Sequence, residues 1–154
     1  MPSKDACEYA VRLLGYRGRS RAELEERLSR KCFDPAETAS ALQKLERLGY
    51  IDDSALAAVL ARQARETRKL GKRGALSFLL GRGIPAGVAL AALEGYDEFE
   101  GAERLARKKL GAMEREGTAA RRRLYAALAR RGYSGETIRK IFSLIIYGEG
   151  GTVK

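Results

Sequence analysis

Apolar residues recur with helical spacing along almost the whole chain. They stand three or four positions apart, as on one face of a helix, in Ala6–Leu14, Leu56–Gln63 and Phe99–Leu110. Each of these runs is followed by two more helical runs joined by a short turn. No segment alternates apolar and polar residues for long enough to predict a strand. The pattern therefore predicts an all-α fold.

A short sequence pattern occurs three times at intervals of about fifty residues. Each copy has a leucine, a basic residue, a helix-breaking turn and a large apolar residue before a new helix: Leu28–Asp34, Leu79–Pro85 and Leu128–Ser134. Apolar residues flank the copies at matching intervals: Leu24, Ala75 and Leu124 before them, and Leu42, Leu93 and Phe142 after them. We therefore predict nine main helices in three tandem three-helix repeats, at residues 1–51, 52–96 and 97–147, with a disordered tail at 148–154.

The expected helix ends carry suitable residues. Ser20–Glu23 has the pattern of a capping box, Asp34–Glu37 places proline in the first turn, and Asp97–Glu100 repeats the cap-plus-glutamate pattern. Glycines follow the helical runs, where a left-handed residue can end a helix: Gly15, Gly49, Gly95 and Gly132. Because one such unit buries little by itself, adjacent repeats should stack into an elongated, curved molecule.

The composition excludes several kinds of site. The chain has 154 residues, of which 45% are hydrophobic, enough for a core without metals or disulfides. It has no histidine and two distant cysteines, Cys7 and Cys32, which we expect to be small buried residues. The polar start, Met1–Asp5, is unlike a secretion signal, and no run is apolar enough to span a membrane. We expect a cytoplasmic protein.

The net charge of +10 indicates a polyanionic partner or an acidic protein surface. Most of the excess lies in Arg62–Arg73 and Arg104–Arg131. In Leu56–Lys72, helical spacing places the apolar residues on one side and the basic residues on the other: Arg62, Arg65, Arg68, Lys69 and Lys72. The alternative is an ordinary solvated face, but five basic residues against Glu66 exceed what solubility needs.

A second basic cluster lies further along the chain, at Arg104–Lys109, Arg121–Arg123 and Arg130–Arg131. Arginines at a helix start oppose the helix dipole, which favours a role in binding phosphate or carboxylate over a generic basic helix. The candidate contact residues are the following: Arg17, Arg19, Arg62, Arg65, Arg68, Lys69, Lys72, Arg73, Arg107, Lys108, Arg121, Arg122, Arg130 and Arg131.

Four segments together resemble the RecX family: Arg17–Leu24, Leu48–Asp53, Gly71 with Leu79–Ile84, and Arg130–Ser134. The resemblance extends from about Ala6 to Ile146. It implies a regulator of the RecA recombinase, built from three-helix repeats, that lodges in the groove of the RecA filament on DNA. Such a regulator limits filament growth, ATP hydrolysis and strand exchange in recombination, DNA repair and the SOS response. We expect a monomer with weak, non-specific contact to the DNA phosphate backbone.

The second repeat departs from the other two. It carries Pro85 where they carry the capping residues Asp34 and Ser134, and its last helix is rich in alanine and glycine. The three repeats are therefore not expected to contribute equally to binding.

No catalytic or cofactor site is predicted. Without histidine the usual general base is missing, and no serine or cysteine has an activating context. Gly71–Arg73 lacks the serine or threonine of a phosphate-binding loop, and Asp52–Asp53 is better explained by helix capping than by a metal. We expect a protein that is not an enzyme and has no cofactor.

The alternative function is a direct DNA-binding regulator of helix-turn-helix type. Only the first repeat, with Gln43, Lys44 and Arg47, offers side chains that could read bases. The tyrosines after helix breaks favour packing between units over base stacking, because they lie beside apolar neighbours: Tyr16, Tyr50, Tyr96 and Tyr133.

Overall fold

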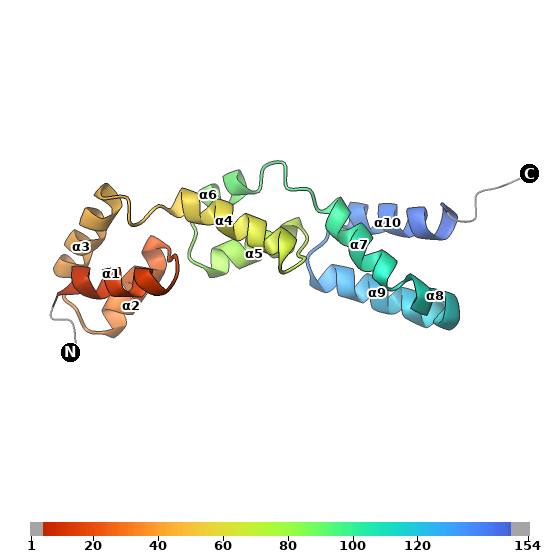
Figure 1. Cartoon of the computed structure of the whole chain (residues 1–154), viewed down its shortest axis with the longest axis horizontal. Coiled ribbons are helices and arrows are strands. Elements are labelled where there is room, and N and C mark those ends of the chain that lie inside the picture. Colours follow the sequence, from red (N-terminus) through yellow and green to blue (C-terminus); the bar gives the residue numbers. More distant parts are fainter. Residues whose placement is uncertain (1–4, 149–154) are drawn as a thin grey trace, which may run out of the picture. The chain divides into compact units, whose positions relative to one another are not determined.

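The computed structural model describes residues 5–148, which contain ten α-helices and no strand (Figure 1). The predicted all-α fold is confirmed. The helices are α1 (Ala6–Tyr16), α2 (Arg21–Arg30), α3 (Pro35–Arg47), α4 (Asp53–Glu66), α5 (Lys72–Gly81), α6 (Ala86–Ala92), α7 (Phe99–Lys108), α8 (Leu110–Glu116), α9 (Thr118–Arg130) and α10 (Gly135–Tyr147). The predicted tail lies outside the described residues from 149 onward, and Gly148 is the C-cap of α10.

The described residues hold ten helices because the first helix of the third repeat is interrupted. The prediction of nine main helices is therefore wrong by one. Lys109, at φ −100° and ψ 0°, separates α7 from α8. Its N–H donates to the carbonyl of Ala106, three residues back, at 3.0 Å, as in the tighter 3₁₀ geometry common at helix ends.

The helices form two compact units, and the middle repeat contributes to both. Unit 1 contains residues up to 60 together with 79–92, and unit 2 contains 61–78 together with the residues from 93 onward. Both α4 and α5 thus begin in one unit and end in the other. The repeat boundaries given above stay a prediction.

The core of unit 1 consists of one apolar face from each of α1, α2 and α3. Small alanines on α1 allow α2 and α3 to approach it closely, and leucines from those two helices fill the space between. The buried residues of this core are Ala6, Ala10, Leu24, Leu28, Ala41, Leu42, Leu45 and Ile51. Tyr9 and Phe33 pack beside it with ring centroids 5.8 Å apart.

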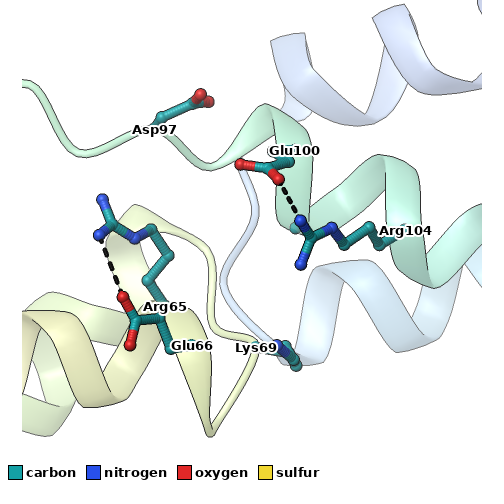
Figure 2. A pocket seen from close by; sticks show the side chains of 7 residues that line it. Arg65, Glu66, Lys69, Asp97, Glu100 and Arg104 are labelled. Carbon is teal, nitrogen blue, oxygen red and sulfur yellow. Dashed lines mark hydrogen bonds and ion pairs between the residues drawn. The ribbon is translucent and has the colours of Figure 1, made fainter.

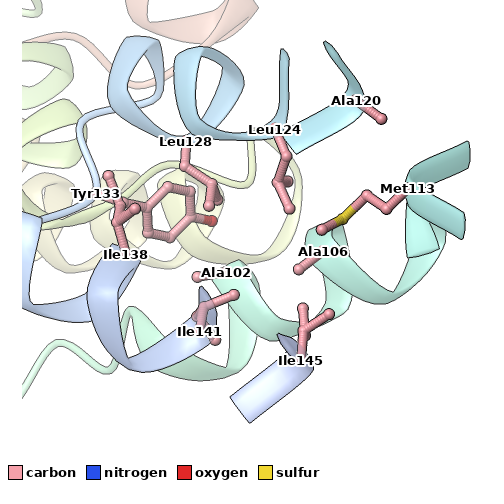
Figure 3. Close-up of a cluster of buried hydrophobic side chains, with 10 residues drawn as sticks. All are labelled: Ala102, Ala106, Met113, Ala120, Leu124, Leu128, Tyr133, Ile138, Ile141 and Ile145. Carbon is pink, nitrogen blue, oxygen red and sulfur yellow. The ribbon is translucent and has the colours of Figure 1, made fainter. Parts of the chain in front are cut away.

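The core of unit 2 has the same composition pattern (Figure 3). Two alanines of α7 face leucines of α9 and isoleucines of α10. The buried residues are Ala102, Ala106, Met113, Ala120, Leu124, Leu128, Tyr133, Ile138, Ile141 and Ile145. The residues that repeat in sequence before each turn, Leu24, Ala75 and Leu124, are each fully buried.

The predicted helix starts are observed in detail. Ser20 Oγ accepts from the Glu23 N–H at 3.1 Å while the Glu23 carboxylate accepts from the Ser20 N–H at 3.1 Å, so the capping box is complete. Asp34 Oδ2 accepts from the Ala36 N–H at 3.1 Å. Asp52 Oδ1 accepts from the Ala55 N–H at 3.0 Å, as expected of a cap.

Some predictions at helix ends are wrong. Gly15 lies inside α1, whereas Gly49, Gly95 and Gly132 do have positive φ. Cys32 is exposed, because it occupies a left-handed turn position (φ 60°) after α2 instead of a helix face. Among the tyrosines, Tyr133 is 3% exposed and packs as predicted, but Tyr16 is 79% exposed and does not. Tyr50 is likewise exposed.

Candidate partner-binding surface

The basic segment 62–73 is not one continuous helix face. Helix α4 ends at Glu66, before the predicted Lys72, and a loop from Thr67 to Gly71 joins it to α5. The Leu70 N–H donates to the Ala64 carbonyl at 2.9 Å, which turns the chain away from the helix axis. Lys69 is left-handed at φ 53°, an uncommon conformation for a residue other than glycine.

Tyr96 and residues of the third repeat hold this loop in place by hydrogen bonds to the backbone carbonyls of the loop. Tyr133 Oη donates to the Lys69 carbonyl at 2.9 Å, and Tyr96 Oη donates to the Leu70 carbonyl at 2.9 Å. The Arg131 guanidinium donates to the carbonyl of Arg68 at 3.3 Å, and the Gly71 N–H donates to the Arg131 carbonyl at 2.9 Å. Arg131, a predicted contact residue, is thus half-buried and engaged within unit 2.

Glycines make this close backbone approach possible. A Cβ on Gly71 would lie 2.3 Å from the Tyr133 Cα, and a Cβ on Gly132 would lie 2.1 Å from the Gly74 nitrogen. Gly132 also has φ 78°. Side chains at these positions would push the loop and the turn apart, so the position of Lys69 depends on residues about sixty positions away in sequence.

Glu98 joins the starts of two helices in unit 2. Its Oε2 accepts from the Lys72 N–H of α5 at 2.7 Å, while its Oε1 accepts from Thr137 Oγ1 at 2.6 Å and from the Ser134 N–H at 3.1 Å. Partial burial by itself would raise the pKa of Glu98, but the hydrogen bonds from Ser134, Thr137 and Lys72 outweigh it and lower the pKa. The carboxylate is therefore held in its charged form.

Unit 1 has a comparable junction, which engages another predicted contact residue. Arg17 pairs with Glu23 at 2.9 Å, and Arg82 pairs with the same carboxylate at 3.2 Å and donates to the Gly18 carbonyl at 3.0 Å. Burial would raise the pKa of Glu23, but its bonds to Arg17, Ser20 and Arg82 lower it. Arg19 is half-buried, and that burial, followed by the charge of Arg17, lowers its pKa.

Other predicted contact residues remain on the surface. Arg107 pairs with Glu103 at 2.8 Å, and Arg65 lies 3.5 Å from Glu66. Because the arginines of both ion pairs are exposed, the pairs contribute little to stability. Arg68 lies over the Phe78 ring at 4.3 Å. Within residues 5–145, the remaining candidates are exposed and form no ion pair: Arg62, Lys72, Arg73, Lys108, Arg121, Arg122 and Arg130.

Five basic residues from α4, the following loop and α7 border a cleft in unit 2, which we call the α7 cleft. Figure 2 shows the part of this cleft that Arg65, Lys69 and Arg104 border. It has two adjoining hollows. The first, of about 460 Å³, is lined by Arg65, Glu66, Lys69, Asp97, Glu100, Gly101 and Arg104. The second, of about 370 Å³, is lined by Lys69, Gly101, Arg104, Leu105, Arg107 and Lys108.

Sequence reasoning missed part of this cleft. Arg104 was recognised only as part of a basic run, Asp97 and Glu100 only as capping residues, and Gly101 was not singled out. Lys69 lies near α7 because Tyr133 and Arg131 hold its backbone in the loop after α4. The sequence carries no local signal for these long-range contacts. Glu98, Arg82 and Tyr96 were also missed as structural partners.

These features define an all-helical tandem-repeat protein with exposed basic residues on its second and third repeats. Residues 6–45 match the model of the first three-helix domain of RecX, and residues 96–142 match that of the third. The chain belongs to the RecX family, which is a family of regulatory proteins and not of enzymes.

Individual relatives agree with this assignment. The chain is 33% identical to the regulatory protein RecX of Chlorobaculum tepidum, over 92% of this chain and 88% of the relative. It is 34% identical to the regulatory protein RecX of Mycolicibacterium smegmatis, over 96% and 81% respectively. The crystal structure of RecX from Lactobacillus salivarius has the same fold, with a TM-score of 0.84 at 23% identity, covering 92% of this chain and 94% of that one.

In the described part of the chain, no helix is both long and apolar enough to cross a bilayer.

Proposed function

We propose that this protein regulates the RecA recombinase by binding the groove of the RecA filament on DNA, where it mainly inhibits filament extension, ATP hydrolysis and strand exchange. It acts as a monomer in the cytoplasm, by binding alone and without an active site of its own. Membership of the RecX family supports the partner, and the exposed cations of the second and third repeats support the mode of contact.

The observation that carries this proposal is the distribution of uncompensated positive charge. In unit 1, Arg17 and Arg21 lie against carboxylates of their own unit. In α9, Arg121 and Arg122 are exposed and lack an ion-pair partner among the residues that the structure places. They lie one turn into α9, which begins at Thr118, and not at the helix start that the sequence predicted, so it is their exposure and lack of a paired carboxylate that leaves them open to an anion.

Both acidic protein surface and DNA phosphate can satisfy these cations. We propose that the phosphate contacts are weak and non-specific, because the exposed cations lie on several elements and are not gathered on one base-reading helix. Helix α6, Ala86–Ala92, has no side chain that can pair with a base edge. Contacts of this kind should weaken steeply as salt is raised.

The direct test is the ATPase activity of RecA on single-stranded DNA, with and without this protein at substoichiometric concentration. Inhibition of ATP hydrolysis, together with reduced strand exchange, is the expected result. Unchanged rates in both assays would contradict the proposal. Sequence-selective binding to naked DNA that survives raised salt would instead favour a helix-turn-helix regulator that uses Gln43, Lys44 and Arg47 of α3.

A further inference from the structure

The α7 cleft combines features that point to a protein ligand. Its second hollow has four cationic residues around an apolar floor formed by Leu105 and Gly101. A Cβ on Gly101 would lie 2.9 Å from Tyr133 Oη, so this part of the floor has little room for any larger residue. The hollow thus presents a small apolar patch directly beside concentrated positive charge.

Two of the four cations are available to a ligand without breaking an existing pair. Arg104 is paired with Glu100 and Arg107 with Glu103, both on the same helix. Lys69 and Lys108 take part in no ion pair in the described portion of the molecule. Lys69 is held at φ 53° by hydrogen bonds to its own carbonyl from Tyr133 and Arg131, so its backbone is fixed before a ligand arrives.

The first hollow argues against a nucleic acid. It shares Lys69, Gly101 and Arg104 with the second, but three carboxylates border it: Glu66, Asp97 and Glu100. A phosphate backbone that continued from the second hollow into the first would meet this negative charge at close range. No aromatic side chain lines either hollow, so bases would find no surface to stack on.

We propose that the α7 cleft binds a short acidic peptide segment of a partner protein. A carboxylate side chain of the segment lies between Lys69 and Lys108, and a neighbouring aliphatic side chain packs on Leu105. The volume of the second hollow, about 370 Å³, suits one or two side chains of this kind. This inference rests on the proposed function, since it specifies which side chains of the protein partner bind in the α7 cleft.

The test uses fluorescence anisotropy with a fluorescein-labelled hexapeptide of alternating glutamate and leucine. We expect saturable binding to the full chain and a loss of affinity of about fivefold in each of Lys69→Glu and Lys108→Glu, because each removes a charge-assisted contact and adds repulsion. Arg139→Glu is the matched control: it makes the same charge change at an exposed position of α10 outside the cleft, and should leave affinity unchanged.

A second peptide, with serine in place of leucine, tests the apolar floor on the unmodified protein. Its affinity should be several-fold lower, because the serine version cannot bury an aliphatic side chain. Equal affinity for the two peptides would overturn the inference, as would equal loss in Arg139→Glu or undiminished binding in the two lysine variants. Displacement of the hexapeptide by oligothymidylate, with loss in the same variants, would assign the cleft to nucleic acid instead.

The outcomes separate this inference from the proposed function, because the peptide titration contains no RecA. Normal RecA inhibition by a protein that fails to bind the peptide overturns the cleft assignment alone. Peptide binding by a protein that leaves RecA unaffected contradicts the proposed function. Circular dichroism of the variants should show retained helicity, because Lys108 is exposed and Lys69 lies in a loop outside the helices.

Discussion

The first and third repeats share a scaffold but differ in how their charges are used. Both place two alanines of one helix against leucines of the next, with Ala6, Ala10 and Leu28 corresponding to Ala102, Ala106 and Leu128. In the first repeat, the C-cap arginine of α1 and the first residue of α2 are paired with carboxylates: Arg17 with Glu23 and Arg21 with Glu46. In the third, Arg121 and Arg122, one turn into α9, have no such partner among the described residues.

The buried leucines of the two repeats maintain the fold, and the unpaired arginines on the surface are available for binding. A buried leucine serves the same purpose in either repeat, whereas Arg17 of the first repeat contributes to a junction and Arg121 of the third remains open to a partner. Positive charge in the sequence is therefore a poor guide to a binding site until the carboxylates around it are known.

The largest expected effects test the equivalence of the two cores. Leu28→Ala and Leu128→Ala each remove a fully buried side chain, and each should lower the free energy of unfolding by roughly 3–5 kcal/mol. Urea titrations followed by circular dichroism measure both losses. If one variant loses less than half as much free energy of unfolding as the other, the two leucines are not equivalent.

Two glycines with nearly the same φ should differ in how well they tolerate alanine. Gly49→Ala, at φ 79° with open space around it, should cost about 1 kcal/mol for the left-handed backbone alone. Gly132→Ala has the same penalty and a clash with the Gly74 backbone, so roughly 2–3 kcal/mol is expected. Thermal and urea unfolding check the difference. Equal costs would mean that the loop and the turn are not held together as described.

The Glu98 junction should make stability depend on pH. The pKa of Glu98 is lowered in the folded protein, so its contribution is present above the unfolded pKa and is lost as the pH falls through the folded value. Glu98→Gln should cost about 1 kcal/mol at pH 7, allowing for solvent screening, and little at about pH 3.

Urea midpoints at several pH values test this, with the exposed Glu94→Gln as the control. A penalty for Glu98→Gln that does not change between pH 7 and pH 3 would exclude a charged Glu98 as the source of the effect.

The features of the fold that depend on local interactions could be predicted from the sequence. Helical spacing of apolar residues predicts the repeats, and the Ser20 and Asp34 caps are formed by residues within three positions of each other. The end of α4 could not be predicted this way, because residues 68–71 are held by Tyr96, Arg131 and Tyr133.

The same reason explains why the sequence did not indicate that two candidate contact residues also have partners within their own units. Arg131 was assigned to a partner because its neighbours are basic, yet its acceptors are carbonyls more than sixty positions away in sequence. The Arg17–Glu23 pair joins residues six apart, beyond the spacing at which helical pairing is expected. The elongated, curved shape of the molecule and the involvement of individual surface arginines in binding stay predictions.

We propose that cations of the second and third repeats make the main contacts with the RecA filament, and that those of α3 in the first repeat contribute little. The most direct measurement is the concentration giving half-maximal inhibition of the RecA ATPase on single-stranded DNA, for Arg65→Glu/Lys69→Glu and for the control Lys44→Glu/Arg47→Glu on α3. We predict an increase of about fivefold or more for the first pair and almost none for the second. Equal inhibition by both variants, or a larger loss in the α3 variant, would contradict the account.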